Sequence, residues 1–153
     1  LWKRLFFVII IDLRHEIKNS IINNNKMKKV VFLCVENSCR SQIAEAFANI
    51  HGKDVILAFS AGSKPSGTVN PKAVSLMKEI NYDLSKHQSI HVDKLPDVEI
   101  DTMISMGCGD SCPTIRAKER IEWDIPDPKD MEDHDFKEVI KNIERKVLDF
   151  LKK

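Results

Sequence analysis

The sequence predicts a single-domain α/β fold built around a four-stranded parallel sheet. Apolar segments of strand length alternate with helical segments from residue 29 onward, in a chain of 153 residues. Strands that alternate with helices are joined by crossover connections, which make the strands parallel. A chain of this length can bury most of its apolar surface in one core, so one domain is expected.

The first part of the pattern contains two strands and one helix. An apolar run at Val30–Val35 predicts a buried strand, and Arg40–His51 is expected to be a helix that Gly52 ends. A second strand is expected at Val55–Ser60.

The second part supplies two further helices and two further strands. Asn70 is a favourable N-cap, Pro71 suits the first helical position, and apolar residues recur at helical spacing as far as Asn81. Apolar segments at Ile100–Met106 and Ile121–Ile125 predict a third strand and a short fourth one. The last helix is predicted from apolar residues on one helical face, namely Phe136, Val139, Ile140, Ile143, Val147, Leu148 and Leu151.

Composition narrows the class of partner. Lys and Arg total 24 and Asp and Glu total 23, interspersed along the chain, which predicts neither a nucleic-acid nor a membrane partner and favours a small solute. The four cysteines lie in two close pairs, Cys34/Cys39 and Cys108/Cys112. So few cysteines exclude a secreted disulfide scaffold and suit catalysis or metal binding in a reducing compartment, so a cytoplasmic protein is expected.

Residues 1–26 differ from the rest and are expected to be an N-terminal extension outside the fold, with the domain spanning 27–153. They contain seven consecutive apolar residues, fewer than the roughly 20 that span a bilayer, and no small-x-small cleavage site follows. The stretch before Met27 is interpreted as a wrongly assigned start or an appended tail. An amphipathic docking segment is the alternative.

The loop between the first strand and the first helix carries the strongest chemical signal. If its backbone N–H groups point inward, they and the positive end of the helix dipole form a cradle for an anion. Cys34 would be stabilised there as a nucleophilic thiolate, and the planar fork of Arg40 matches two oxygens of a tetrahedral oxyanion. The predicted oxyanion-binding loop comprises Val35, Glu36, Asn37, Ser38, Cys39 and Arg40.

Neighbouring residues of this loop have predicted roles of their own. The hydroxyl of Ser41 can donate to the Cys34 thiolate, although ordinary first-turn polarity is the alternative. The Asn37 amide can hold the loop in shape, and Asn also tolerates a left-handed backbone. Glu36 should point to solvent, because a carboxylate that faces an anion opposes its binding. Cys39 is either a packed thiol or a partner for a shunt disulfide with Cys34.

These motifs resemble the low-molecular-weight protein tyrosine phosphatase superfamily, and within it the thiol-dependent arsenate reductases. The resemblance runs from about Met27 to the C-terminus. It rests on Cys-x5-Arg-Ser from Cys34 to Ser41, followed in order by Ser60-Ala-Gly62, Asn70-Pro71-Lys-Ala73 and Asp127-Pro128. It implies a three-layer sandwich whose active site lies beyond the carboxyl ends of the strands.

The resemblance also implies catalytic roles for the later motifs. Asp127 would be the general acid, although an acidic solvated loop is the alternative reading of residues 124–135. Cys108 and Cys112 resemble a redox loop, and their three intervening residues allow the roughly 4.4–6.8 Å Cα separation of a disulfide.

The implied activity is reduction of arsenate to arsenite through a Cys34 adduct, relayed to a Cys108–Cys112 disulfide. No bound cofactor or metal is expected. The electrons would come from an external thiol, either a thioredoxin-like protein or a low-molecular-weight thiol. The alternative is a tyrosine phosphatase that hydrolyses phosphate monoesters through a Cys34-phosphate. A minor alternative is a cysteine-based metal- or arsenite-binding protein, although the cysteine spacings match the usual zinc sites poorly.

Overall fold

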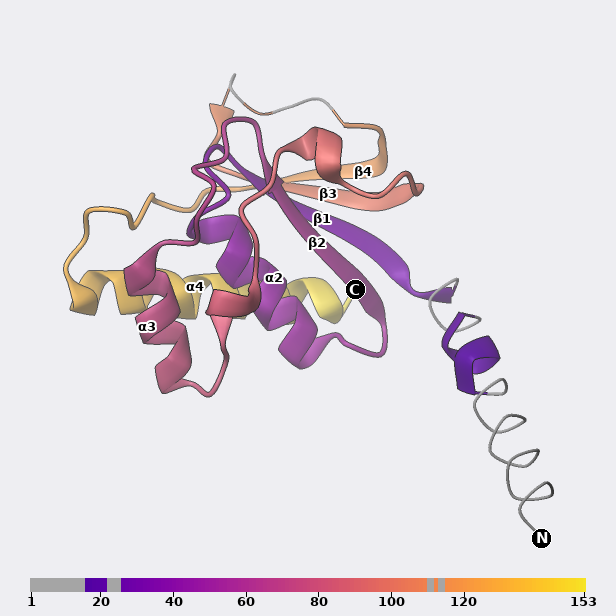
Figure 1. Cartoon of the computed structure of the whole chain (residues 1–153), viewed down its shortest axis with the longest axis horizontal. Helices are drawn as coiled ribbons and strands as arrows, with labels where there is room; N and C mark the ends of the chain where they lie inside the picture. Colours follow the sequence, from indigo (N-terminus) through magenta and orange to yellow (C-terminus); the bar gives the residue numbers. More distant parts are fainter. Residues whose placement is uncertain (1–15, 22–25, 110–111, 113–114) are drawn as a thin grey trace, which may run out of the picture.

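A computed structural model describes residues 16–21, 26–109, 112 and 115–153. Four parallel strands form one sheet in the order β2-β1-β3-β4, which confirms the predicted fold class (Figure 1). The strands are β1 (Lys28–Cys34), β2 (Ile56–Gly62), β3 (Ile100–Met106) and β4 (Ala117–Trp123). The strand that ends in Cys34 therefore lies inside the sheet, paired on both sides.

Three α-helices pack against one face of the sheet (Figure 1). They are α2 (Arg40–His51), α3 (Pro71–Glu79) and α4 (Asp133–Leu151). Two short 3-10 helices, η1 (Leu84–Lys86) and η2 (Val92–Lys94), interrupt the long connection from α3 to β3. The third layer is built by this connection rather than by a long helix, because residues of η2 and its flanks pack on the other face.

Alternate side chains of β1 enter two separate cores. Val30 and Phe32 pack with the α-helices, whereas Val31 and Leu33 pack on the opposite face. All four are fully buried, as a central parallel strand requires. The continuous apolar run that predicted this strand is thus explained by burial on both faces.

Local signals set the ends of α3. The Asn70 side chain accepts hydrogen bonds from the backbone N–H groups of Lys72 and Ala73, at 2.8 and 3.2 Å. This is the predicted N-cap. The helix ends at Glu79, two residues before the predicted Asn81, which has a left-handed φ of 64°.

The predicted fourth strand was placed too late in the chain. We expected it at residues 121–125, but β4 begins at Ala117 and ends at Trp123. Its first half is exposed and charged because β4 is an edge strand, and charged side chains are common there. The first two strands also differ by one or two residues at their ends from the predicted ranges 30–35 and 55–60.

The extension predicted for residues 1–26 falls largely outside the described residues, and within it residues 16–21 are helical. Among the described parts of the chain, no helix is both long and apolar enough to cross a membrane.

Candidate active site

The carboxyl edge of the sheet holds a cavity of about 560 Å³ whose lining includes the predicted Cys34, Arg40 and Asp127, but not Ser41, Cys108 or Cys112. Cys34 ends β1 and Arg40 begins α2, so one loop supplies the cavity floor. The lining comprises Cys34, Val35, Glu36, Ser38, Cys39, Arg40, Gly107, Asp124, Ile125 and Asp127. Of the predicted loop, only Asn37 lies behind the cavity rather than in its lining.

Hydrogen bonds direct the Ser41 hydroxyl at the candidate nucleophile. Cys34 Sγ lies 2.9 Å from Ser41 Oγ. The amide Nδ2 of Asn37 donates one hydrogen to Ser41 Oγ at 2.8 Å and the other to Ser60 Oγ at 3.0 Å. Because Ser41 Oγ accepts from Asn37, its own hydrogen is free to stabilise negative charge on the Cys34 sulfur.

Asn37 gives the loop its shape without a glycine. Its backbone has a left-handed φ of 47° and its side chain is fully buried. Its carbonyl oxygen Oδ1 accepts from the Ile90 backbone N–H at 2.9 Å and from Gln42 Nε2 at 3.0 Å. Both predicted properties, the amide tie and the left-handed conformation, are therefore present in this residue.

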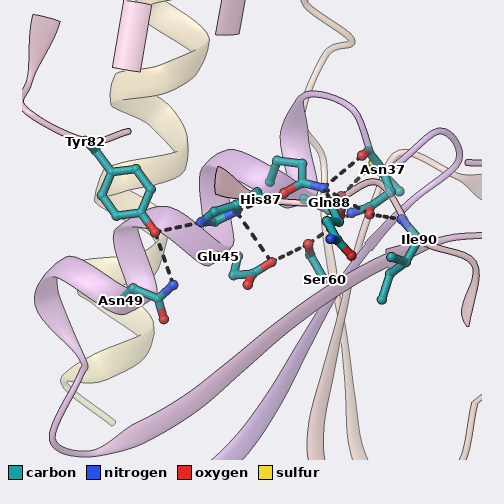
Figure 2. A network of polar contacts seen from close by, with 11 residues as sticks. Asn37, Glu45, Asn49, Ser60, Tyr82, His87, Gln88 and Ile90 are labelled. Atoms are coloured by element: carbon teal, nitrogen blue, oxygen red, sulfur yellow. Dashed lines mark hydrogen bonds and ion pairs between the residues drawn. The ribbon is translucent and has the colours of Figure 1, made fainter. Parts of the chain in front are cut away.

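A chain of polar side chains continues from Gln42 toward the surface. Figure 2 shows its His87, Tyr82 and Asn49 members. Gln42 Oε1 lies 3.0 Å from His87 Nδ1, and because a carbonyl oxygen only accepts, that nitrogen carries the proton. Burial lowers the pKa of His87, which favours the neutral ring. His87 Nε2 then accepts from the Tyr82 hydroxyl at 2.7 Å, and Tyr82 accepts from Asn49 at 3.3 Å. Every donor in this chain points toward the loop.

Glu45 is a partly buried carboxylate beside the same network (Figure 2). The Ser60 hydroxyl donates to Glu45 Oε2, and His87 Nδ1 lies 3.9 Å from that oxygen. Burial raises the pKa of Glu45 to about 7, and the hydrogen bond from Ser60 offsets only part of this effect. Glu45 therefore exchanges its proton near neutral pH.

Replacing Glu45 by glutamine should remove a pH dependence of stability. Because the pKa of Glu45 is raised from 4.5 to about 7 on folding, the folded state binds more protons in that window. The contribution of protonated Glu45 to the free energy of unfolding is fully present below pH 4.5 and is lost as the pH rises through 7. The wild type should lose about 3 kcal/mol relative to Glu45→Gln across this window.

Denaturant unfolding at several pH values measures this difference. The exposed Glu122→Gln variant is the control and should follow the wild type. Parallel profiles for the wild type and Glu45→Gln would show that the Glu45 carboxylate is not protonated near neutral pH.

Arg40 is buried and is held from the far side of the cavity. Its Nη1 donates to the Ile125 carbonyl at 3.1 Å, and its Nη2 lies 3.3 Å from Asp127 Oδ2. Gly107, with a φ of 64°, passes so close that an added Cβ would lie 2.5 Å from Arg40 Nη1. The loops after β3 and β4 thus fix the guanidinium over the Cys34 loop.

Asp127 and Glu36 lie at the cavity mouth. Asp127 is half exposed and lines the cavity, so its carboxylate can reach an oxyanion bound there. Glu36 was predicted to point to solvent, and its side chain is partly exposed. Its carboxylate pairs with Lys129 Nζ at 2.9 Å.

The other two cysteines form a disulfide. Cys108 and Cys112 are joined with a Cα separation of 4.8 Å, and Cys108 directly follows the Gly107 that lines the cavity. Cys39 is a free buried thiol, and burial together with the Asp127 charge raises its pKa to about 12. Cys39 is therefore a protonated packed thiol, which favours the first of its two predicted roles.

Several contributors to this site were not predicted. Gln42 and His87 lie 45 residues apart in the chain and meet only in the folded structure. Gln88, which accepts from Gln42, and Ile90, which donates to Asn37, contribute backbone atoms that any residue possesses. Gly62 belongs to the predicted motif Ser60-Ala-Gly62. The structure explains why it is a glycine, because an added Cβ would lie 2.4 Å from the Val35 carbonyl oxygen.

Comparison with known proteins places the site in context. The family model for low molecular weight phosphotyrosine protein phosphatase matches residues 29–153. A glutaredoxin arsenate reductase of Synechocystis sp. is 34% identical over 130 residues, 83% of this chain and 98% of that relative. An arsenate reductase of Halalkalibacterium halodurans is 42% identical over 113 residues, 71% of this chain and 80% of that relative. A solved arsenate reductase in the phosphate binding state has a TM-score of 0.73 and 33% identity, covering 81% of this chain and 96% of the other.

Proposed function

This chain belongs to the low molecular weight phosphotyrosine protein phosphatase family, and from that premise we propose that it reduces arsenate to arsenite. The observation that carries the proposal is the Cys108–Cys112 disulfide beside the Cys34 cavity. Phosphate ester hydrolysis needs one nucleophile and no electrons, whereas arsenate reduction needs two electrons from thiols. A second cysteine pair at this place can supply those electrons, and no step of the phosphatase reaction needs it.

The first step forms a bond between the Cys34 sulfur and arsenic. Arg40 and the backbone N–H groups of the loop bind the arsenate oxygens, and the Ser41 hydroxyl keeps Cys34 as a thiolate. As the sulfur attacks arsenic, one oxygen leaves, and Asp127 donates the proton that makes it water.

The second step transfers the electrons. The Cys108 thiolate attacks the Cys34 sulfur, the sulfur–arsenic bond breaks, and its electron pair stays on arsenic, which leaves as arsenite. Cys112 then attacks Cys108, which frees the Cys34 thiolate and forms the Cys108–Cys112 disulfide. The structure has this disulfide together with a free Cys34, which matches the proposed end of the cycle.

An external dithiol completes the cycle by reducing the Cys108–Cys112 disulfide. A thioredoxin- or glutaredoxin-like protein is the proposed donor, since one of the relatives is a glutaredoxin arsenate reductase. Repeated use of thiols requires a reducing compartment, so we place the reaction in the cytoplasm.

Phosphatase activity is the second candidate, and the cavity itself favours it. Cys34, Arg40 and Asp127 line one cavity, and these groups suffice to bind a phosphate monoester, attack it and protonate the leaving group. Arsenate and phosphate share shape and charge, so we propose that the reductase retains some aryl phosphatase activity.

Replacing either redox cysteine separates the two activities. Cys108→Ser and Cys112→Ser should each stop multiple-turnover arsenate reduction, and Cys112→Ser should accumulate a Cys34–Cys108 disulfide because nothing resolves it. Aryl phosphate hydrolysis should stay within a few-fold of the wild type in both. The measurements are arsenite formed with a thioredoxin or glutaredoxin system, the rate of phenol release, and mass spectrometry of the disulfides.

Undiminished arsenate turnover in both variants would contradict the relay. The protein would then be a phosphatase, or a transferase that uses one cysteine and an external thiol.

A further inference from the structure

A second ion pair joins the oxyanion loop to the loop of Asp127. Lys129 Nζ donates to both carboxylate oxygens of Glu36, at 2.9 and 3.1 Å. The backbone N–H of Lys129 also donates to Asp127 Oδ1 at 3.2 Å. The pair therefore fixes Lys129 to one loop and, through its backbone, orients the Asp127 carboxylate of the other.

The Glu36 end of this pair is firmly held. The Glu36 carbonyl accepts hydrogen bonds from the Ser66 backbone N–H and the Ser89 hydroxyl, both at 3.0 Å. Its hydrogen bonds to Lys129 in turn raise the pKa of the Lys129 ammonium, which stays charged at neutral pH. Glu36 is thus a fixed anchor to which the more exposed loop is attached.

Arg40 also joins the two loops, through its hydrogen bond to the Ile125 carbonyl and its ion pair with Asp127, and the ion pair is weakened during turnover. The ion pair of Asp127 and Arg40 uses the guanidinium nitrogen Nη2, one of the donors that a bound oxyanion needs. A general acid must also be protonated before it can donate, and a neutral carboxyl group is attracted less to Arg40. Substrate binding therefore weakens the direct hold of Arg40 on the Asp127 carboxylate when the position of Asp127 matters most, while the Arg40–Ile125 hydrogen bond fixes only the loop backbone two residues earlier.

We propose that the Glu36–Lys129 ion pair is a latch that keeps Asp127 over the leaving oxygen once substrate occupies Arg40. Lys129 is then a positioning residue that acts through Asp127. The inference rests on the proposed function, because it requires Asp127 to be the general acid.

The test uses aryl phosphates whose phenols range from strongly to weakly acidic. A weakly acidic phenol needs protonation as it leaves, whereas a strongly acidic one departs without it. Lys129→Met and Glu36→Gln should each lower kcat/KM about two- to five-fold more for the weakly acidic leaving groups than for the strongly acidic ones, the range that an exposed ion pair supplies. The double variant should lose no more than either single variant, because both remove the same latch.

Salt and a distant lysine provide the controls. Raising the ionic strength from about 0.05 to 0.5 M should move the wild type toward the Lys129→Met rate while that variant changes little. Lys141→Met removes a lysine that pairs with Glu138 on α4, and should behave as the wild type.

Two results overturn the latch. An equal loss for all leaving groups would show that Lys129 assists anion binding instead, and normal rates for both single variants would show that the pair holds nothing. Asp127→Asn on the same series separates this failure from failure of the proposed function. If the rate loss caused by Asp127→Asn is the same for weakly and strongly acidic phenols, Asp127 is not the general acid, and the latch proposal fails with it.

Discussion

Cys34→Ser is expected to abolish both arsenate reduction and aryl phosphate hydrolysis, by more than roughly 10⁴-fold. A serine hydroxyl is not ionised at neutral pH, and its oxygen cannot take part in disulfide exchange. The Ser41 hydroxyl, 2.9 Å from the sulfur, would face a neutral oxygen that needs no stabilisation. Initial rates with each substrate measure the effect.

The folded state and the anion cradle should survive this change. Cys34 lies at the end of β1, and one oxygen in place of its sulfur leaves the strand pairs and Arg40 in place. Inorganic phosphate should therefore still bind to Cys34→Ser, as calorimetry can show. Cys39→Ala is the matched control, because that thiol is buried and protonated and its loss should cost stability rather than abolish turnover. Turnover of either substrate by folded Cys34→Ser would contradict the proposed chemistry.

Arg40→Lys is expected to reduce turnover about 10²- to 10³-fold while the net charge stays the same. The guanidinium spans the cavity by donating to Ile125 with one nitrogen and facing Asp127 with the other. A lysine ammonium is a single point charge that cannot make this planar pair of contacts and also bind two oxyanion oxygens.

Kinetics and phosphate binding measured together identify the cause. Both kcat/KM and the affinity for inorganic phosphate should fall in Arg40→Lys. Arg145→Lys, on the exposed part of α4, changes the same chemical group away from the cavity and should have no effect. Near-normal phosphate binding by Arg40→Lys would mean that Arg40 does not contact the anion.

Parts of the fold could be predicted because their signals are local. Ile100–Met106 and Arg40–His51 have the predicted bounds, since a buried apolar run and a helix that starts after a loop and ends at Gly52 are visible within a few residues. The start of β4 could not be predicted, because its charged residues join the sheet only through pairing with β3. Long-range pairing leaves no mark on the sequence of an edge strand.

The same distinction applies to the site. Cys34, Arg40 and Ser41 lie at the two ends of the short loop between β1 and α2, and their spacing was enough to predict that they meet. His87 gave no signal, because its importance depends on Gln42 and Tyr82, which only folding brings to either side of its ring. Lys129 was missed for a similar reason, since its partner Glu36 comes from a segment more than ninety residues earlier.

The four cysteines of the chain have three different chemical states. Cys39 is a buried thiol that its raised pKa keeps protonated, Cys108 and Cys112 are bonded to each other, and Cys34 is the other free thiol of the cavity lining, with the Ser41 hydroxyl 2.9 Å from its sulfur. The thiolate is the form that reacts, so the protonated Cys39 reacts slowly. A thiol-alkylating reagent added to the folded, oxidised protein should therefore react at a single position. The amount of reagent consumed by the folded protein measures the molecules with an intact Cys34 thiol. Unfolding the sample in the same reagent exposes Cys39 as well, and this second reaction measures the total protein.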